Sequence, residues 1–180
     1  CILSKLINCM EVILIRHTTP KIEKGVCYGQ SDIEIEDSFE EEFLTIQKQL
    51  KNIDDTIAFY SSPLKRCAIL AKKLSKNISF DDRLKELNFG DWELKKWDDI
   101  DKKTLDIWMN DFVNIAPTNG ESYINMFGRT SGFLEELKEK GILSSANYRN
   151  IYSKCKGGYF RNRRHIKLYI TKHRLAEEKK

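Results

Sequence analysis

The chain has 180 residues, of which 41% are hydrophobic and 11% aromatic, an ordinary composition for one globular domain with a sizeable core. No stretch approaches the roughly 18 consecutive apolar residues of a membrane span, so we expect no membrane segment and a soluble, cytoplasmic protein. Five cysteines without a Cys-x-x-Cys spacing argue against a disulfide framework and against a structural zinc site.

The net charge of +4 is unevenly divided along the chain. Residues 141–180 hold 11 Lys/Arg and 2 Asp/Glu, whereas residues 1–140 hold 20 and 25. A tail this basic can be a nucleic-acid or membrane arm, and it can equally be sequence unrelated to the domain before it. At the other end, residues 1–9 precede Met10, and we interpret them as an N-terminal extension.

The first predicted element is a short apolar run, Val-Ile-Leu-Ile at residues 12–15, which is typical of a strand buried on both faces of a parallel sheet. It ends on Arg16 and His17. Ligands of open α/β sheets bind beyond the carboxyl ends of the strands, so this cation and imidazole suit a phosphate. An ordinary strand end with a hydrogen-bonded histidine is the alternative.

A polar loop over residues 21–32 follows, and then a helix that begins after Ser38. Ser38 is predicted to cap this helix, with Glu41 reaching back to complete a capping box. Residues 43–50 carry apolar side chains at helical spacing. The first unit is therefore strand, loop and helix.

A second apolar run at residues 56–60 predicts another strand, and residues 64–74 predict a helix after it. Arg66 falls in the first turn of that helix, close to the end of the strand and to the free N–H groups of a helix start. It can point at the same phosphate as Arg16. The alternative for Arg66 is a solvated helix charge.

Four further segments complete the predicted domain. Residues 77–80 predict a short strand, and residues 82–93 form a loop dense in aromatics and carboxylates, of a kind that is often functional. Residues 98–112 predict a helical insertion with an apolar face that suits either a core or a lid. Residues 122–137 predict an amphipathic helix after a turn.

Four motifs occur in one order: Arg16-His17, Ser61-Ser-Pro-Leu-Lys-Arg66, Leu84-Lys-Glu-Leu-Asn-Phe-Gly-Asp-Trp-Glu93 and Gly120-Glu-Ser122. In this order they resemble the histidine phosphatase superfamily, from Glu11 to about Lys140. Within it the chain looks most like the α-ribazole phosphatases, because Arg-His-Thr-Thr-Pro followed by Cys27-Tyr-Gly-Gln-Ser-Asp32 is similar to their first loop. Phosphoglycerate mutase-like and broad-specificity members share the core motifs, and Thr18 stands where the familiar motif has glycine.

The resemblance implies an α/β fold, a three-layer sandwich whose mostly parallel central sheet is flanked by helices, incomplete or altered at the C-terminus. It implies a phosphomonoesterase that works through a phosphohistidine, without metal or cofactor, on a small phosphorylated metabolite. The substrate expected is α-ribazole phosphate, hydrolysed to α-ribazole in cobalamin biosynthesis. A pseudo-phosphatase that binds a phosphorylated ligand and a broad-specificity or mutase-like enzyme are the alternatives. Neither nucleic acid nor a membrane is an expected partner.

The resemblance also assigns roles to single residues. His17 is the expected nucleophile, and Glu86 is expected to protonate the leaving oxygen and later to take a proton from water. A surface carboxylate paired with a lysine is the alternative for Glu86. The expected substrate-binding residues are two arginines and three residues of the first loop, namely Arg16, Arg66, Tyr28, Gly29 and Gln30.

The family pattern then fails. A complete member has a second histidine just after the strand that follows the Gly-Glu-Ser helix, and residues 141–156 contain no histidine. His173 is the uncertain candidate for that position, and His165 is the other later histidine. We therefore predict a phosphatase-like domain over residues 10–140 and a basic non-family tail over residues 141–180, such as a shift of reading frame near Lys140 would produce.

Overall fold

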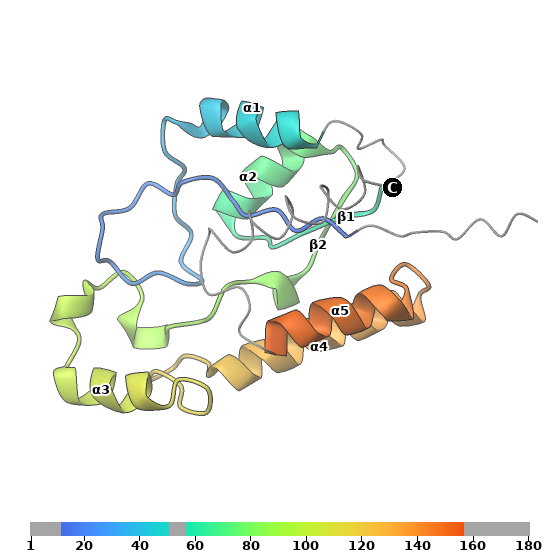
Figure 1. Cartoon of the computed structure of the whole chain (residues 1–180). Helices are drawn as coiled ribbons and strands as arrows, with labels where there is room; N and C mark the ends of the chain where they lie inside the picture. Colours follow the sequence, from blue (N-terminus) through green and yellow to red (C-terminus); the bar gives the residue numbers. More distant parts are fainter. Residues whose placement is uncertain (1–11, 51–56, 157–180) are drawn as a thin grey trace, which may run out of the picture. The chain divides into compact units, whose positions relative to one another are not determined.

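The computed structural model describes residues 12–50 and 57–156. Residues 14–130 form one compact unit, and the described residues from Ser131 onward belong to a second. The helices and strands follow the order α1 (Phe39–Gln49), β1 (Phe59–Ser61), α2 (Lys65–Leu74), β2 (Ile78–Phe80), α3 (Lys102–Asn110), α4 (Tyr123–Glu139) and α5 (Ser145–Lys156) (Figure 1). Three single-turn helices, Asp82–Leu84, Gly90–Trp92 and Trp97–Asp99, lie between β2 and α3.

The first unit is built on a strand–helix–strand pattern. β1 and β2 are parallel, with Phe59 opposite Ile78 and Ser61 opposite Phe80, and α2 connects them. α1 packs on α2 through Phe39, Phe43 and Leu70, which are buried together (Figure 1). The predicted α/β class with a parallel sheet is confirmed, and both predicted helices and the short strand near residues 77–80 form.

The strand predicted over residues 12–15 is wrong. These residues extend without joining the sheet, and Val12 and Leu14 are 40% and 47% exposed, so only one face of the segment is covered. In the described part of the chain the sheet consists of β1 and β2, and residues 12–15 belong to neither strand. The segment where the family's next strand is expected forms α5 instead.

The capping box predicted at the start of α1 is also wrong. Ser38 is the residue before the helix, but its hydroxyl makes no capping bond and donates instead to the Glu42 carboxylate, at 2.8 Å. Glu42 in turn accepts the backbone N–H of Thr19, at 3.1 Å. Glu42, rather than the predicted Glu41, is therefore the partner of Ser38, and it also connects α1 to the segment after His17.

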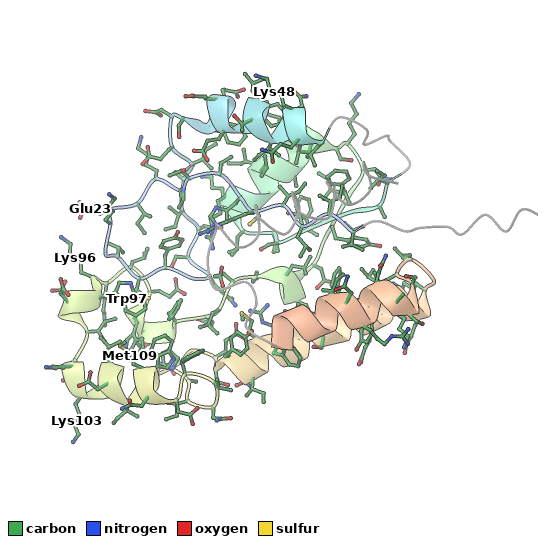
Figure 2. The ribbon with its side chains drawn as sticks, in the orientation of Figure 1. Glu23, Lys48, Lys96, Trp97, Lys103 and Met109 are labelled. Carbon is green, nitrogen blue, oxygen red and sulfur yellow. The ribbon has the colours of Figure 1, made fainter. Side chains whose placement is uncertain are left out.

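The insertion predicted over residues 98–112 contains the shorter α3 and forms part of a core. Trp108 of α3 stacks on Trp97, with ring centroids 6.2 Å apart, and both pack against the buried cluster that contains Trp92 and Cys27. In Figure 2, Lys103 of the same helix points away from this cluster. Leu105 and Trp108 of α3 thus pack against this core, while Ile107 and Met109 on the same helix are 49% and 62% exposed.

The second unit contains the end of α4 and α5. Gly141 takes a positive φ of 71°, which ends α4, and the backbone N–H groups of Ile142 and Leu143 return to the carbonyl of Leu137. Tyr148 of α5 donates to Glu135 of α4, at 2.9 Å. Among the described residues, no helix is both long and apolar enough to cross a membrane.

Leu70 provides a test of this packing. Leu70→Ala leaves a cavity between α1 and α2, and we expect the free energy of unfolding to fall by ~2–5 kcal/mol, as for buried leucines in general. Leu44→Ala, at a position that is 51% exposed on α1, should change it by less than ~0.5 kcal/mol. Urea denaturation followed by circular dichroism measures both, and equal losses would contradict the packing.

Candidate active site

Four of the predicted site residues converge. His17 lies within electrostatic reach of Arg16, Arg66 and Glu86, each of which shifts its pKa. Arg16 and His17 come from the segment before α1, Arg66 from the first turn of α2, and Glu86 from the loop before the single turn at Gly90–Trp92. Residues far apart in sequence are thus brought to one place, within one compact unit.

The His17 ring is fixed in one tautomer. Its Nδ1 lies 2.7 Å from the carbonyl oxygen of Thr18, and a carbonyl can only accept, so Nδ1 carries the hydrogen. Burial lowers the pKa of His17 from its ordinary value of 6.5, and the cations of Arg66 and Arg16 lower it further, against the opposing effects of the Thr18 carbonyl and Glu86. At neutral pH the ring is therefore neutral, with a lone pair on Nε2.

The Arg66 guanidinium is almost completely buried, at 1% exposure. Its Nη2 donates to the carbonyl of Gly29 at 2.6 Å and its Nη1 to the carbonyl of Ser31 at 3.0 Å, while the plane lies over the Tyr28 ring, 5.4 Å from its centroid. Its Nε is buried and has no hydrogen-bond partner among the described residues. Carbonyl oxygens carry no net charge, so the cation is oriented without being neutralised.

The first loop is locked to the start of α2. The Asp32 carboxylate accepts the backbone N–H of Lys65 at 2.8 Å, which satisfies one of the free donors of the helix start. A Cβ at Gly29 would overlap the carbonyl oxygen of Leu87, so this position admits only glycine. Gly29, predicted as a substrate-binding residue, contributes its carbonyl to Arg66 and its small size to the loop.

The Glu93 carboxylate gathers the backbone of the first loop. It accepts the N–H groups of Gly29 and Gln30, both at 2.9 Å, and of Ser31 and Phe89, both at 3.1 Å, together with the hydroxyl of Ser31. Burial works to raise the pKa of Glu93, but these hydrogen bonds outweigh it and lower the pKa below its usual value. The side chain is therefore an anion at neutral pH.

A second carboxylate, Glu121, fixes the loop that carries Glu86. It pairs with Arg129 of α4 and accepts the backbone N–H of Asn88 at 3.0 Å. Arg129 and the Gln30 side-chain amide both donate to the carbonyl of Glu86, at 2.9 and 3.0 Å. Gln30 thus has a structural contact, and its predicted role in binding substrate stays a prediction.

Sequence reasoning missed Glu93, Glu121 and Arg129 as members of the site. Glu93 and Glu121 stand inside the motifs Leu84–Glu93 and Gly120–Ser122, which were used only for the resemblance. His173 and His165 lie outside the described residues, so the second histidine stays a prediction. No group of three metal-ligating side chains is arranged to hold an ion within residues 12–50 and 57–156.

Residues 12–142 match the family model described as the histidine phosphatase superfamily, branch 1. A provisionally named phosphoserine phosphatase 2 of Hydrogenobacter thermophilus is 29% identical over 158 residues, covering 82% of this chain and 73% of the relative. The adenosylcobalamin/α-ribazole phosphatase of Escherichia coli is 36% identical over 59 residues, covering 31% of this chain and 29% of that protein.

Two solved structures share the fold. A mycobacterial glucosyl-3-phosphoglycerate phosphatase aligns with a TM-score of 0.60 at 21% identity, covering 69% of this chain and 61% of that one. The α-ribazole phosphatase of Shigella flexneri aligns with a TM-score of 0.58 at 24% identity, covering 65% of this chain and 61% of that one. The chain thus spans about three fifths of the length of these two neighbours.

The C-terminal part has a separate likeness. Residues 118–174 match the model of the C-terminal domain of ribosomal protein L19e. The large ribosomal subunit protein eL19 of Methanococcus vannielii is 36% identical over 58 residues, covering 32% of this chain and 39% of that protein. The C-terminal part that does not fit the phosphatase pattern therefore has a likeness of its own, and a shift of reading frame near Lys140 stays a prediction.

The environment of His17 predicts its titration. We expect nuclear magnetic resonance to give a pKa below 6.5 for its ring, and Arg66→Ala to raise that pKa because a nearby cation is removed. Since the pKa is lower in the folded state than in the unfolded state, the stability due to neutral His17 is complete above pH 6.5 and is lost as the pH falls through the folded value. A pKa above 6.5, or one that falls in Arg66→Ala, would contradict the geometry.

Proposed function

The chain belongs to the histidine phosphatase superfamily, branch 1, and on this premise we propose that it hydrolyses phosphate monoesters through a phosphohistidine on His17. The observation that carries the proposal is the pairing of an oriented, neutral imidazole with a buried guanidinium whose Nε has no partner among the described residues. The imidazole is a nucleophile, and the guanidinium is a site for the phosphate anion that the imidazole attacks.

The first step transfers the phosphoryl group. The lone pair of His17 Nε2 attacks phosphorus, and the bond between phosphorus and the ester oxygen breaks. Arg66 and the exposed Arg16 stabilise the charge on the equatorial oxygens, and Glu86 gives a proton to the departing alkoxide. By analogy with oxyanion donors, each arginine contributes ~10²–10³ in rate.

The second step releases phosphate. Glu86, now a carboxylate, takes a proton from water as the water oxygen attacks phosphorus. The bond between phosphorus and Nε2 breaks, and its electron pair returns to the ring. The hydrogen bond from Nδ1 to the Thr18 carbonyl holds the ring in place and favours the charge that develops on it when phosphorylated.

The missing second histidine sets the expected rate. The segment where the family has it is the start of α5, which contains no histidine. Loss of one transition-state contact lowers turnover by ~10²–10³. A slow phosphatase, or a pseudo-phosphatase that binds its ligand and turns it over poorly, is therefore the second form of the same proposal, and His173 is the candidate that would restore the contact.

We propose α-ribazole phosphate as the substrate, which would place the protein in cobalamin biosynthesis. The support is the first loop around Tyr28 and the likeness to the Escherichia coli enzyme. Phosphoserine, suggested by the relative from Hydrogenobacter thermophilus, is the competing substrate. The proposal includes a small phosphorylated metabolite as partner and a cytoplasmic location, which the odd number of cysteines favours.

His17→Ala tests the mechanism. The full chain is incubated with α-ribazole phosphate, phosphoserine or a chromogenic phosphate ester, in the presence of a chelator. We expect an acid-labile, alkali-stable phosphate on the unaltered chain and none on His17→Ala, with turnover lost in parallel. Labelling that survives His17→Ala, or activity that the chelator removes, would refute a metal-independent phosphohistidine.

A second candidate function concerns the basic tail. Residues 118–174 resemble a protein named for the large ribosomal subunit, and residues 141–180 carry a net charge of +9. Lysines and arginines that neutralise phosphates release counterions and bind nucleic acid in a salt-dependent way. The likeness therefore favours ribosomal RNA as a further ligand, which the sequence alone did not lead us to expect.

Two neighbouring arginines of the tail test this function. We expect the full chain to bind large-subunit ribosomal RNA, and Arg163→Gln/Arg164→Gln to reduce the slope of log affinity against log salt by about 2. Lys48→Gln/Lys76→Gln, at exposed positions of the described part, should leave the slope unchanged. Equal slopes in all three proteins would sink the idea, and filter binding between low and physiological salt measures them.

A further inference from the structure

We infer that Glu93 is a positioning residue, which sets the place of the Arg66 guanidinium through the backbone of residues 29–31. The inference rests on the proposed function, because Arg66 is there the site of the phosphoryl group. Glu93 belongs to the loop after β2 and lies 27 positions beyond Arg66 in the sequence. Its connection to Arg66 runs through the first loop and not through a direct contact of the two side chains.

One rigid peptide unit makes the connection. The bond between Gly29 and Gln30 is planar and trans, so its N–H and its C=O point in opposite directions. The N–H, which belongs to Gln30, donates to Glu93 Oε1 at 2.9 Å. The C=O, which belongs to Gly29, therefore faces the other way and accepts from Arg66 Nη2 at 2.6 Å. Turning this peptide away from Glu93 would break the bond to Arg66.

The neighbouring residues hold the same orientation from both sides. Glu93 Oε2 accepts the N–H of Gly29 at 2.9 Å and that of Ser31 at 3.1 Å, so three successive amides surround one carboxylate. Ser31 then places its own carbonyl 3.0 Å from Arg66 Nη1. Both outer nitrogens of the guanidinium are thus bonded to a backbone that Glu93 orients.

The indirect connection has a chemical consequence. A carboxylate in contact with Arg66 would neutralise the cation and compete with a phosphate for its donors. The neutral peptide between Gly29 and Gln30 holds the Arg66 guanidinium in place and leaves its charge available to a phosphate. The lowered pKa of Glu93 agrees with this arrangement, because only the ionised carboxylate accepts from every one of its donors.

Glu93→Gln tests the inference in the full chain, with inorganic phosphate as the probe. The substitution replaces one acceptor oxygen by an NH₂ group that faces backbone N–H groups. We expect the dissociation constant for phosphate, measured by calorimetry, to rise ~10- to 100-fold, as for other outer partners of binding groups. Glu41→Gln, at an exposed position on α1, is the matched control and should leave it unchanged.

A double-mutant cycle separates positioning from general damage to the fold. If Glu93 acts through Arg66, Glu93→Gln should weaken phosphate binding less than ~2-fold when Arg66→Ala is already present, since coupled positions are not additive. The Nε–H resonance of Arg66 should also shift in Glu93→Gln. Equal losses with and without Arg66, or unchanged phosphate binding in Glu93→Gln, would overturn the inference.

Ser31→Ala covers the case in which Glu93→Gln does not fold. It removes only the hydroxyl bond to Glu93, and we expect a ~3- to 10-fold weaker affinity for phosphate, with unchanged affinity overturning the inference. The proposed function fails separately. If the chain binds phosphate as expected but His17 is never phosphorylated, the positioning role stands and the hydrolysis does not; if it binds no phosphate, both are wrong.

Discussion

A buried cation is the constraint on which this site depends. Arg66 has a guanidinium at 1% exposure, and a charge removed from water must be hydrogen-bonded or the fold pays heavily in free energy. Two backbone carbonyls and the face of Tyr28 meet that need, and no carboxylate of residues 12–50 or 57–156 forms an ion pair with the guanidinium. The first loop, its attachment to α2 through Asp32 and its attachment to Glu93 are all consequences of keeping those carbonyls in place. The Nε–H of Arg66, which has no hydrogen-bond partner among the described residues, can donate to a phosphate oxygen.

Much of the fold could be predicted from the sequence, but the strand predicted at residues 12–15 does not form, and this error has a physical cause. The helices α1, α2 and α4 carry apolar residues at intervals of three and four, a local property that sequence reports directly. A strand is different, because it exists only if another strand pairs with it. Residues 12–15 have the composition of a buried strand, yet Val12 and Leu14 are 40% and 47% exposed and the segment belongs to neither strand of the described sheet. The composition of residues 12–15 alone does not reveal whether a partner strand is present.

The residues of the site also divide into those that the sequence indicated and those that it did not. His17 and Arg66 could be proposed from the sequence because they stand just beyond apolar runs, whereas the role of Glu86 came from the family resemblance. Glu93 could not be proposed, because its partners are mainly backbone N–H groups, which every residue has and which leave no pattern in the sequence. Arg129 could not be proposed either, because its ion pair with Glu121 and its bond to the carbonyl of Glu86 depend on the fold. Gln30 was predicted to contact substrate through the resemblance of the first loop, and its amide donates to the carbonyl of Glu86, a contact that the sequence did not indicate.

The two family matches overlap in a part of the chain that contributes to the site. Residues 118–142 belong to both matches, and they include Glu121 and Arg129, which hold the loop of Glu86. A chain that departs from the phosphatase pattern after α4 therefore keeps each contact that orients Glu86, and it keeps the loop around Arg66 as well, because Glu93 lies earlier still. Residues 141–156 lack both the strand and the second histidine that the resemblance places beyond that helix. The contacts that orient Glu86 and Arg66 therefore all come from residues 12–142, the range that matches the histidine phosphatase model.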